Sequence, residues 1–231
     1  MTRAPRQLLI DGSTAPCITG GGYLPSVILD RSISRAWATV VAHFTRPGDV
    51  VVDLTYRDSE WDEFLELSPR RVVRLDLDPS LRKVDARADW RIVPLRSGVA
   101  MLCLWDTPWN LDAGKDGDAR RRYTAPYKHV HEILADMEPE EWARVVRPRG
   151  YFVARTMNFF HAGKFVDLRG AVARDMRARG PWEPWGEVLV EVGGRAPNHP
   201  MREDRPTVTT RHSYFTIFKR TNAKTKVRQF I

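Results

Sequence analysis

Residues 99–109 read VAMLCLWDTPW, an apolar run that ends in an acid, a proline and an aromatic residue. A short continuous apolar stretch is typical of a strand that is covered on both faces. Ligands of open α/β sheets bind beyond the carboxyl ends of such strands. There, Asp106 offers an acceptor for an amino group, Pro108 stiffens the turn, and Trp109 offers a flat face for stacking. The stretch favours a site for a planar ring with an exocyclic amine, although acids and prolines are also common in ordinary turns.

Strands and helices are expected to alternate on both sides of this run. The apolar patterns predict strands at 49–54, 71–78, 90–93, 99–104, 151–155, 187–192 and 213–218. They predict helices at 32–44, 59–67, 127–146 (with a break at Pro139) and 164–179. Alternation of this kind indicates an α/β fold with a mostly parallel, seven-stranded sheet and helices on both faces. The last two strands have no helix between them, which predicts a closing antiparallel hairpin with 213–218 beside 151–155.

The chain divides into three predicted parts. Residues 1–46 form an N-terminal segment whose helix packs on the core, residues 47–220 form the main domain, and residues 221–231 form a basic tail. The Gly-rich stretch at 20–22 is interpreted as a turn, because it does not lie between a strand and a helix as a phosphate loop does. The tryptophan-rich stretch at 182–185 is interpreted as packing or a rigid turn.

Composition is typical of a globular protein inside the cell. The 231 residues are 42% hydrophobic and 29% charged, and no apolar run reaches the length of about 20 residues that spans a bilayer. The first residues lack the apolar region of a signal peptide, so we expect a cytoplasmic location. The two cysteines, Cys17 and Cys103, form neither a disulfide framework nor a metal motif, and we expect no bound metal.

The formal net charge of +8 favours a polyanionic partner, of which nucleic acid is the commonest. Basic and aromatic residues interleave just after the 99–109 run, an arrangement that suits phosphate contact and base stacking. The candidate nucleic-acid-binding residues there are Lys115, Arg120, Arg121, Arg122, Tyr123 and Lys128. A solvated loop is an equal alternative for this segment, and residues 193–211 form a second candidate surface.

The order of these features resembles the class I S-adenosylmethionine-dependent methyltransferases, which have a Rossmann-like fold. More narrowly, it is similar to phage and bacterial DNA methylases that modify adenine N6 or cytosine N4. Their amine-facing motif is an Asp, Asn or Ser, then Pro-Pro, then an aromatic residue, and residues 106–109 keep three of these four positions. Residues 48–56 are similar to the family's first motif and residues 211–219 to its last strand. The resemblance covers about residues 23–220.

The resemblance implies S-adenosylmethionine as the cofactor and DNA as the partner. It assigns cofactor binding to the first motif and to the acids that follow the next two strands, with Trp90 beside the adenine ring. These residues are Asp53, Thr55, Tyr56, Asp76 or Asp78, Asp89 and Trp90. It assigns catalysis to Asp106, Pro108 and Trp109, with Asp106 accepting hydrogens of the target amine and Trp109 stacking on the base.

The first motif departs from the family pattern. It normally continues with Gly-x-Gly, where the chain approaches the cofactor closely, but residues 57–59 read RDS. Side chains at these positions are expected to narrow the methionine part of the pocket. An alternative function is therefore a catalytically inactive methyltransferase-like protein that binds nucleic acid or serves in assembly. Methylation of RNA or of a small amine is a third possibility, and the sequence indicates no oligomeric state.

Overall fold

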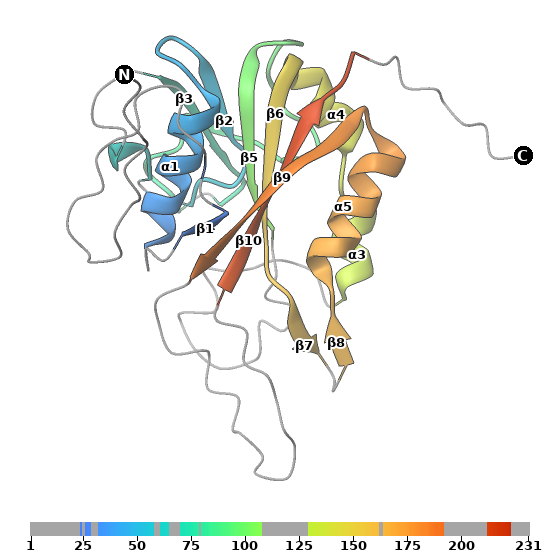
Figure 1. Ribbon diagram of the computed structural model, residues 1–231. Coiled ribbons are helices and arrows are strands. Elements are labelled where there is room, and N and C mark those ends of the chain that lie inside the picture. Colours follow the sequence, from blue (N-terminus) through green and yellow to red (C-terminus); the bar gives the residue numbers. More distant parts are fainter. Residues whose placement is uncertain are drawn as a thin grey trace, which may run out of the picture.

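The computed structural model describes residues 24, 26–28, 32–57, 61–64, 70–78, 80–107, 129–161, 164–191 and 212–222. Its main feature is an eight-stranded sheet in the order β1-β9-β10-β6-β5-β2-β3-β4 (Figure 1). The strands are β1 (Val27–Ile28), β2 (Val50–Asp53), β3 (Arg71–Asp76), β4 (Ala86–Arg87), β5 (Ala100–Asp106), β6 (Val146–Thr156), β9 (Trp182–Glu191) and β10 (His212–Arg220).

The strand directions confirm the predicted fold class. Strands β2 to β6 pair in parallel, whereas β10 pairs antiparallel with both β6 and β9. The β9–β10 pair is the predicted C-terminal hairpin, and β10 lies beside β6 as expected. The sheet has eight strands rather than seven. Short β1 pairs in parallel with β9 at the edge of the sheet and was not expected from the sequence.

The strand predicted at 90–93 lies at a different position in the chain. The strand that pairs with β3 is β4, and residues 90–93 form turns. The carboxylate of Asp89 accepts the N–H of Arg91 at 2.9 Å, and the carbonyl of Asp89 accepts the N–H of Ile92 at 3.0 Å. Local hydrogen bonds of this kind compete with strand pairing. Ile92 is 76% exposed, so the apolar residue that suggested a strand here is not buried.

Three further boundaries differ from the prediction. The strand expected at 151–155 begins five residues earlier, because β6 starts at Val146 directly after α4. The expected helix at 164–179 begins only at Leu168, because residues Lys164–Val166 form β8, which pairs with β7 (Phe159–His161). Helix α5 (Leu168–Arg179) begins where the Asp167 carboxylate accepts the N–H of Gly170. Strand β9 begins at Trp182, so the tryptophan-rich stretch is a strand rather than a turn. The alternative interpretation as packing is correct for Trp182, which is buried in the core, whereas Trp185 is 51% exposed. The hairpin register shifts beside Pro184, a position where a bulge tolerates proline.

The remaining helices follow the predicted pattern more closely. Helix α1 (Ile33–Phe44) has Ser32 as its N-cap, and its hydroxyl accepts the N–H of Arg35. The long helix predicted at 127–146 is broken at Pro139, as expected, into α3 (Val130–Ala135) and α4 (Pro139–Val145). Of the predicted helix at 59–67, the structure describes the 3₁₀ turn η1 (Trp61–Phe64).

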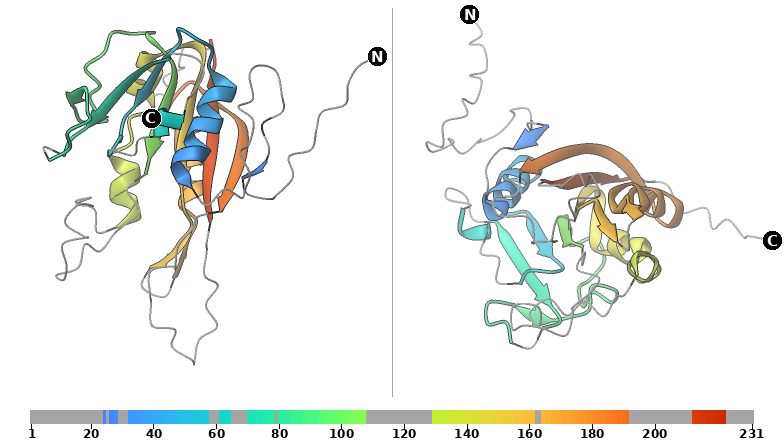
Figure 2. Two further views of the ribbon diagram at one scale, coloured as in Figure 1. Left: turned by 90° about the vertical axis from the view of Figure 1, so that its left-hand side faces the viewer. Right: turned by 90° about the horizontal axis from the view of Figure 1, so that it is seen from below.

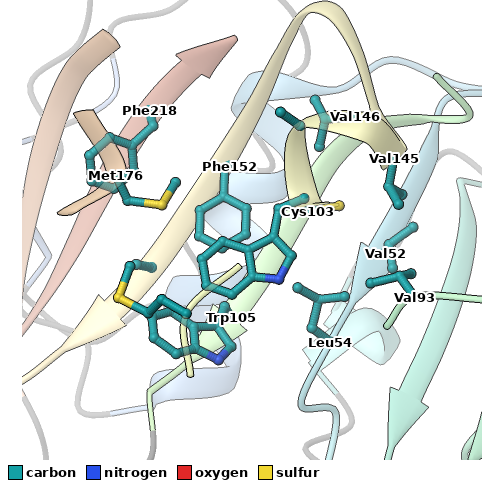
Figure 3. Close-up of a cluster of buried hydrophobic side chains, with 14 of the residues drawn as sticks. Val52, Leu54, Val93, Cys103, Trp105, Val145, Val146, Phe152, Met176 and Phe218 are labelled. Carbon is teal, nitrogen blue, oxygen red and sulfur yellow. The ribbon is translucent and has the colours of Figure 1, made fainter. Parts of the chain in front are cut away.

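Helices cover both faces of the sheet, as the two further views show (Figure 2). On one face α1 packs on the strands, with the ring of Trp37 stacked on Phe215 at 4.1 Å. On the other face α3, α4 and α5 enclose a larger cluster that contains Trp105, Phe152 and the buried Cys103 (Figure 3). Within the described ranges, no helix has the length and apolar character needed to cross a membrane.

Candidate functional site at the carboxyl edge of the sheet

Three acids stand at the carboxyl ends of neighbouring parallel strands. Asp53 ends β2, Asp76 ends β3 and Asp106 ends β5. Asp53 is opposite Arg74 on β3 and opposite Leu104 on β5, so Asp76 and Asp106 each lie two residues further along. Residues two apart in a strand share a face. The three carboxylates therefore follow one face of the sheet, the face that α1 covers.

Asp53 is the most buried of the three, with 5% of its surface exposed. Its carboxylate accepts the N–H of Thr55 at 3.0 Å and the indole N–H of Trp61 at 2.7 Å. Burial, with a smaller contribution from the charges of Asp106 and Asp76, raises the pKa of Asp53 to about 7, against the lowering effect of the two hydrogen bonds. Asp53 therefore exchanges a proton near neutral pH at the centre of the acid row.

Asp76 connects the loop after β2 to the end of β3. One carboxylate oxygen accepts the N–H of Arg57 at 3.2 Å, and the other accepts the N–H of Asp78 at 2.9 Å. Asp78 instead bonds the backbone and hydroxyl of Ser80, and these hydrogen bonds hold the pKa of Asp78 below its usual range. Of the two alternatives for the end of this strand, the structure places Asp76 in the row and Asp78 in a local turn.

Arg57 stands where the resemblance predicts the first glycine of the first motif. Its φ is +49°, in the left-handed region that favours glycine. The backbone thus takes a glycine-like conformation without a glycine, and the side chain of Arg57 is exposed. An exposed side chain differs from the expectation that Arg57 fills the pocket, although the other two residues of this stretch, 58 and 59, lie outside the described ranges.

The two residues before Arg57 make structural contacts. The hydroxyl of Thr55 accepts the backbone N–H of Asp106 at 2.8 Å, which ties the end of β2 to the end of β5. Tyr56 is 1% exposed, and its hydroxyl donates to Asp62 at 2.8 Å. Burial, together with that hydrogen bond, raises the pKa of Tyr56. The ring and the hydroxyl of Tyr56 are both buried. Its contacts within the chain therefore explain its position without a bound ligand.

Asp89 and Trp90 lie away from the acid row. Asp89 pairs with Arg91 at 2.6 Å, and this interaction lowers the pKa of Asp89. The ring centroid of Trp90 lies 4.6 Å from that of Trp105, and its carbonyl accepts the indole N–H of Trp142 at 2.9 Å. Trp105 and Trp142 belong to the cluster under α3–α5. Trp90 therefore packs at the margin of that face, opposite the face that carries the acids.

Within the part of the chain that the structure describes, one of the two carboxylate oxygens of Asp106 has a hydrogen-bond partner and the other has none. Its Oδ2 accepts Nη1 of Arg155 at 2.5 Å. Its Oδ1 is buried and has no hydrogen-bond partner among the described residues. Nε of Arg155 donates to the hydroxyl of Ser213 on β10 at 3.2 Å. Sequence reasoning missed Arg155 and Ser213, and the available signal was a basic residue at the end of the apolar run at 151–155.

Several predicted site residues lie outside the described ranges. They are Pro108 and Trp109 of the amine-facing motif, the basic and aromatic set Lys115, Arg120, Arg121, Arg122, Tyr123 and Lys128, and the loop at 193–211. The Gly-rich stretch at 20–22, which is interpreted as a turn, also lies outside these ranges. Their assignments stay predictions. Among the residues that the structure does describe, no group of three or more His, Cys, Asp or Glu side chains is arranged to hold a metal ion.

No family model matches the sequence, and no curated protein matches it. Solved structures of similar shape include a candidate DNA modification methylase from Thermus thermophilus in complex with S-adenosyl-L-methionine, at 14% identity and a TM-score of 0.39 over 59% of this chain and 54% of that one. The chain thus spans about half the length of that protein.

Two other similar structures cover more of the chain. Geranyl diphosphate C-methyltransferase from Streptomyces coelicolor matches at 14% identity and a TM-score of 0.49, over 80% of this chain and 78% of that one. A SAM-dependent methyltransferase from Methanosarcina mazei matches at 10% identity and a TM-score of 0.45, over 79% and 97%.

Proposed function

We propose that this protein is an S-adenosylmethionine-dependent methyltransferase that acts on the exocyclic amino group of adenine or cytosine in DNA. The observation that carries this proposal is the buried Oδ1 of Asp106, an acceptor without a partner among the described residues. A buried acceptor left without a hydrogen bond is costly, so its presence suggests a ligand that donates to it. An amino group directed to the end of β5 supplies such a donor.

The chemistry of the acid row fits the proposed cofactor. Each oxygen of Asp76 accepts one backbone N–H and keeps a further acceptor site, which suits the two hydroxyls of a ribose. Leu77 follows directly and is 63% exposed, which offers apolar surface beside the ribose for an adenine ring. When bound, the cofactor supplies an electrophilic methyl group.

The residues of the chain act on the acceptor amine and its position. The lone pair of an exocyclic amine is delocalised into its ring. By accepting one amine hydrogen, Oδ1 of Asp106 would favour a localised lone pair on the amine nitrogen. Transfer of a methyl group to that nitrogen would break the methyl–sulfur bond of the bound cofactor, leave a neutral thioether and release one amine proton to solvent. The hydroxyl of Thr55 accepts the backbone N–H of Asp106, and this hydrogen bond fixes the position of the Asp106 backbone at the end of β5. Most of the rate acceleration is expected to come from this positioning.

The choice of DNA rests on charge and on the amine-facing motif. A net charge of +8 favours a polyanion, and residues 106–109 keep three of the four positions of the DNA amino-methylase motif. A target base within a duplex must be flipped out of the stack, at a cost of a few kcal/mol. Pro108, Trp109 and the basic segment at 112–128 are proposed to receive that base and the adjacent phosphates.

The test is transfer of tritiated methyl groups from labelled S-adenosylmethionine to adenine- and cytosine-containing DNA, with calorimetric titration of the cofactor alongside. Asp106→Ala is expected to abolish transfer while leaving cofactor affinity within a few-fold, because Asp106 acts on the acceptor. Asp175→Ala, which removes an ion-paired acid from α5, serves as the matched control and should leave transfer unchanged. No transfer by the wild-type protein to any nucleic acid at saturating cofactor contradicts the proposal.

A second candidate function is favoured by one observation, the absence of any glycine at 57–59. A Cβ where the family chain passes close to its cofactor favours a protein that has lost catalysis and binds nucleic acid. The same titration separates the two functions. If titration with S-adenosylmethionine or its demethylated product gives no heat and no thermal shift, while DNA binding is measurable, the result supports the catalytically inactive protein.

A further inference from the structure

We propose that Arg155 is a positioning residue, which aims the unpartnered Oδ1 of Asp106 at a neutral amino group of the target base. This inference rests on the proposed function and assigns a role to a residue that the family motif does not include. Arg155 touches neither the base nor the methyl group. It acts through Asp106, and it is itself held by Ser213.

Strand register brings the three residues together. Arg155 on β6 is directly opposite Asp106 on β5 and directly opposite Phe215 on β10. Ser213 lies two residues before Phe215 and therefore on the same face. The guanidinium of Arg155 thus spans three adjacent strands on the α1 face, with one nitrogen on Asp106 and another on Ser213.

Both ends of Arg155 are fixed. Its carbonyl accepts the backbone N–H of Thr107 at 3.1 Å and the hydroxyl of Thr107 at 2.8 Å. The side chain of Arg155 is 13% exposed, that of Asp106 is 27% exposed, and Ser213 is fully buried. An arginine held in this way loses little further freedom when it orients a carboxylate, because its planar fork is already in place.

The pairing changes what Asp106 can accept. A carboxylate that rotates freely offers two equivalent oxygens. Here Arg155 binds Oδ2, which fixes the orientation of the carboxylate and therefore the direction in which Oδ1 can accept a hydrogen bond. The guanidinium stays protonated, so the pair carries no formal net charge. A neutral pair of this kind suits the neutral exocyclic amine of a nucleobase rather than a cationic ammonium group.

The experiment measures binding rather than methyl transfer. Fluorescence anisotropy compares a labelled single-stranded oligothymidine that carries one adenine with the same strand carrying unsubstituted purine, which lacks the amino group. Both are measured at fixed salt in the presence of the demethylated cofactor product. The wild-type protein is expected to prefer adenine by about tenfold, the value of one hydrogen bond to a charged acceptor. Asp106→Asn removes the charge and should reduce that preference.

Variants of Arg155 decide between positioning and a purely structural role. Arg155→Met should abolish the preference for adenine, Arg155→Lys should restore part of it, and Ser213→Ala should weaken it. Arg179→Met is the matched control, because Arg179 also pairs with an acid and donates to backbone carbonyls, but on α5. It is expected to lower thermal stability and leave the preference unchanged. Melting curves confirm that each variant is folded.

Two outcomes overturn the inference. A folded Arg155→Met variant that keeps the full wild-type preference shows that Arg155 does not aim Asp106, and the proposed function then survives. A wild-type protein that binds adenine and unsubstituted purine equally also overturns it. In that case the tritium-transfer assay decides separately whether the methyltransferase function fails.

Discussion

At the scale of single residues, Asp53 combines burial with two hydrogen bonds and two neighbouring negative charges. Its pKa of about 7 in the folded chain lies above the ordinary value of 3.8, so the folded chain binds this proton more tightly than the unfolded chain. The resulting stabilisation is complete at pH values below the unfolded pKa and is lost as pH rises through the folded pKa. Ionisation of Asp53 therefore lowers the free energy of unfolding as pH rises from about 4 to about 7.

The corresponding prediction concerns Asp53→Asn. Between about pH 4 and about pH 7.5, the free energy of unfolding of the wild type should fall relative to that of the variant by on the order of 1–4 kcal/mol. Urea unfolding at several pH values measures the free energy of unfolding of both proteins. Acids in salt bridges change stability with pH in the opposite direction, but they are common to both proteins, so their contribution cancels when the value for the variant is subtracted from that for the wild type. A difference that stays constant across this range contradicts the burial argument, and Asp175→Asn is the control.

Arg57 supports a second prediction at this scale. A non-glycine residue in the left-handed region costs on the order of 1 kcal/mol, and the sequence resemblance places the Cβ of Arg57 where the chain is expected to approach the proposed cofactor. Arg57→Gly is therefore expected to increase both thermal stability and cofactor affinity. Arg57→Ala shortens the side chain but keeps the Cβ, so it separates the two causes. If Arg57→Gly weakens cofactor binding while Arg57→Ala does the same, the exposed guanidinium holds the cofactor instead.

The candidate site was partly predictable from the sequence. Asp53, Asp76 and Asp106 each end an apolar run, and parallel strands bring their carboxyl ends to one edge of a sheet. The pairing of Arg155 with Asp106 and Ser213 was not predictable, because Arg155 is 49 positions from Asp106 and 58 positions from Ser213 in the sequence. Such pairings depend on strand register, and a shift of one residue would turn each side chain to the other face.

At the scale of elements, strands that are buried on both faces were predicted well, whereas the exposed stretch at 90–93 and the two-residue strand β4 were not. The buried strands β2, β5 and β6 and the amphipathic helix α1 follow their sequence patterns, because burial on both faces, or on one stripe, decides their composition. Strand β4 has two residues, and no periodic pattern exists over so short a stretch. Its position is decided by hydrogen bonds of the Asp89 turn and by pairing with β3.

Two glycines in neighbouring parts of the sheet give a matched prediction. A Cβ on Gly150 of β6 would lie 2.6 Å from Val146 Cγ1 and 2.8 Å from the carbonyl of Met101, whereas on Gly186 of β9 its nearest neighbour is Ile217 at 3.9 Å. Gly150→Ala is expected to destabilise the fold by about 1–3 kcal/mol, because a backbone atom cannot easily move away. Gly186→Ala should be nearly neutral. Equal melting temperatures for the two variants would contradict this packing.

At the scale of the whole molecule, charge is expected to govern association with nucleic acid. Release of counterions makes the affinity for a single strand fall with salt, by about 0.7 in log–log slope for each neutralised phosphate. The double variant R120S/R121S should make this slope shallower by about 1. R174S/R177S removes the same charge from exposed positions of α5 and should leave the slope unchanged. Equal effects of both pairs would show that net charge alone drives binding.

The place of β10 in the sheet has a consequence for synthesis of the protein. Residues 212–220 lie between β6 and β9, although they follow both in the chain. Until the ribosome has released them, β6 and β9 each present an open edge, and such edges invite pairing with other chains. Ser213 belongs to β10, so its hydrogen bond with Arg155 can form only after β10 has paired with β6. A nascent chain therefore passes through a vulnerable stage in which most of its core exists but its sheet is split, and chaperones that mask strand edges should matter most at that moment.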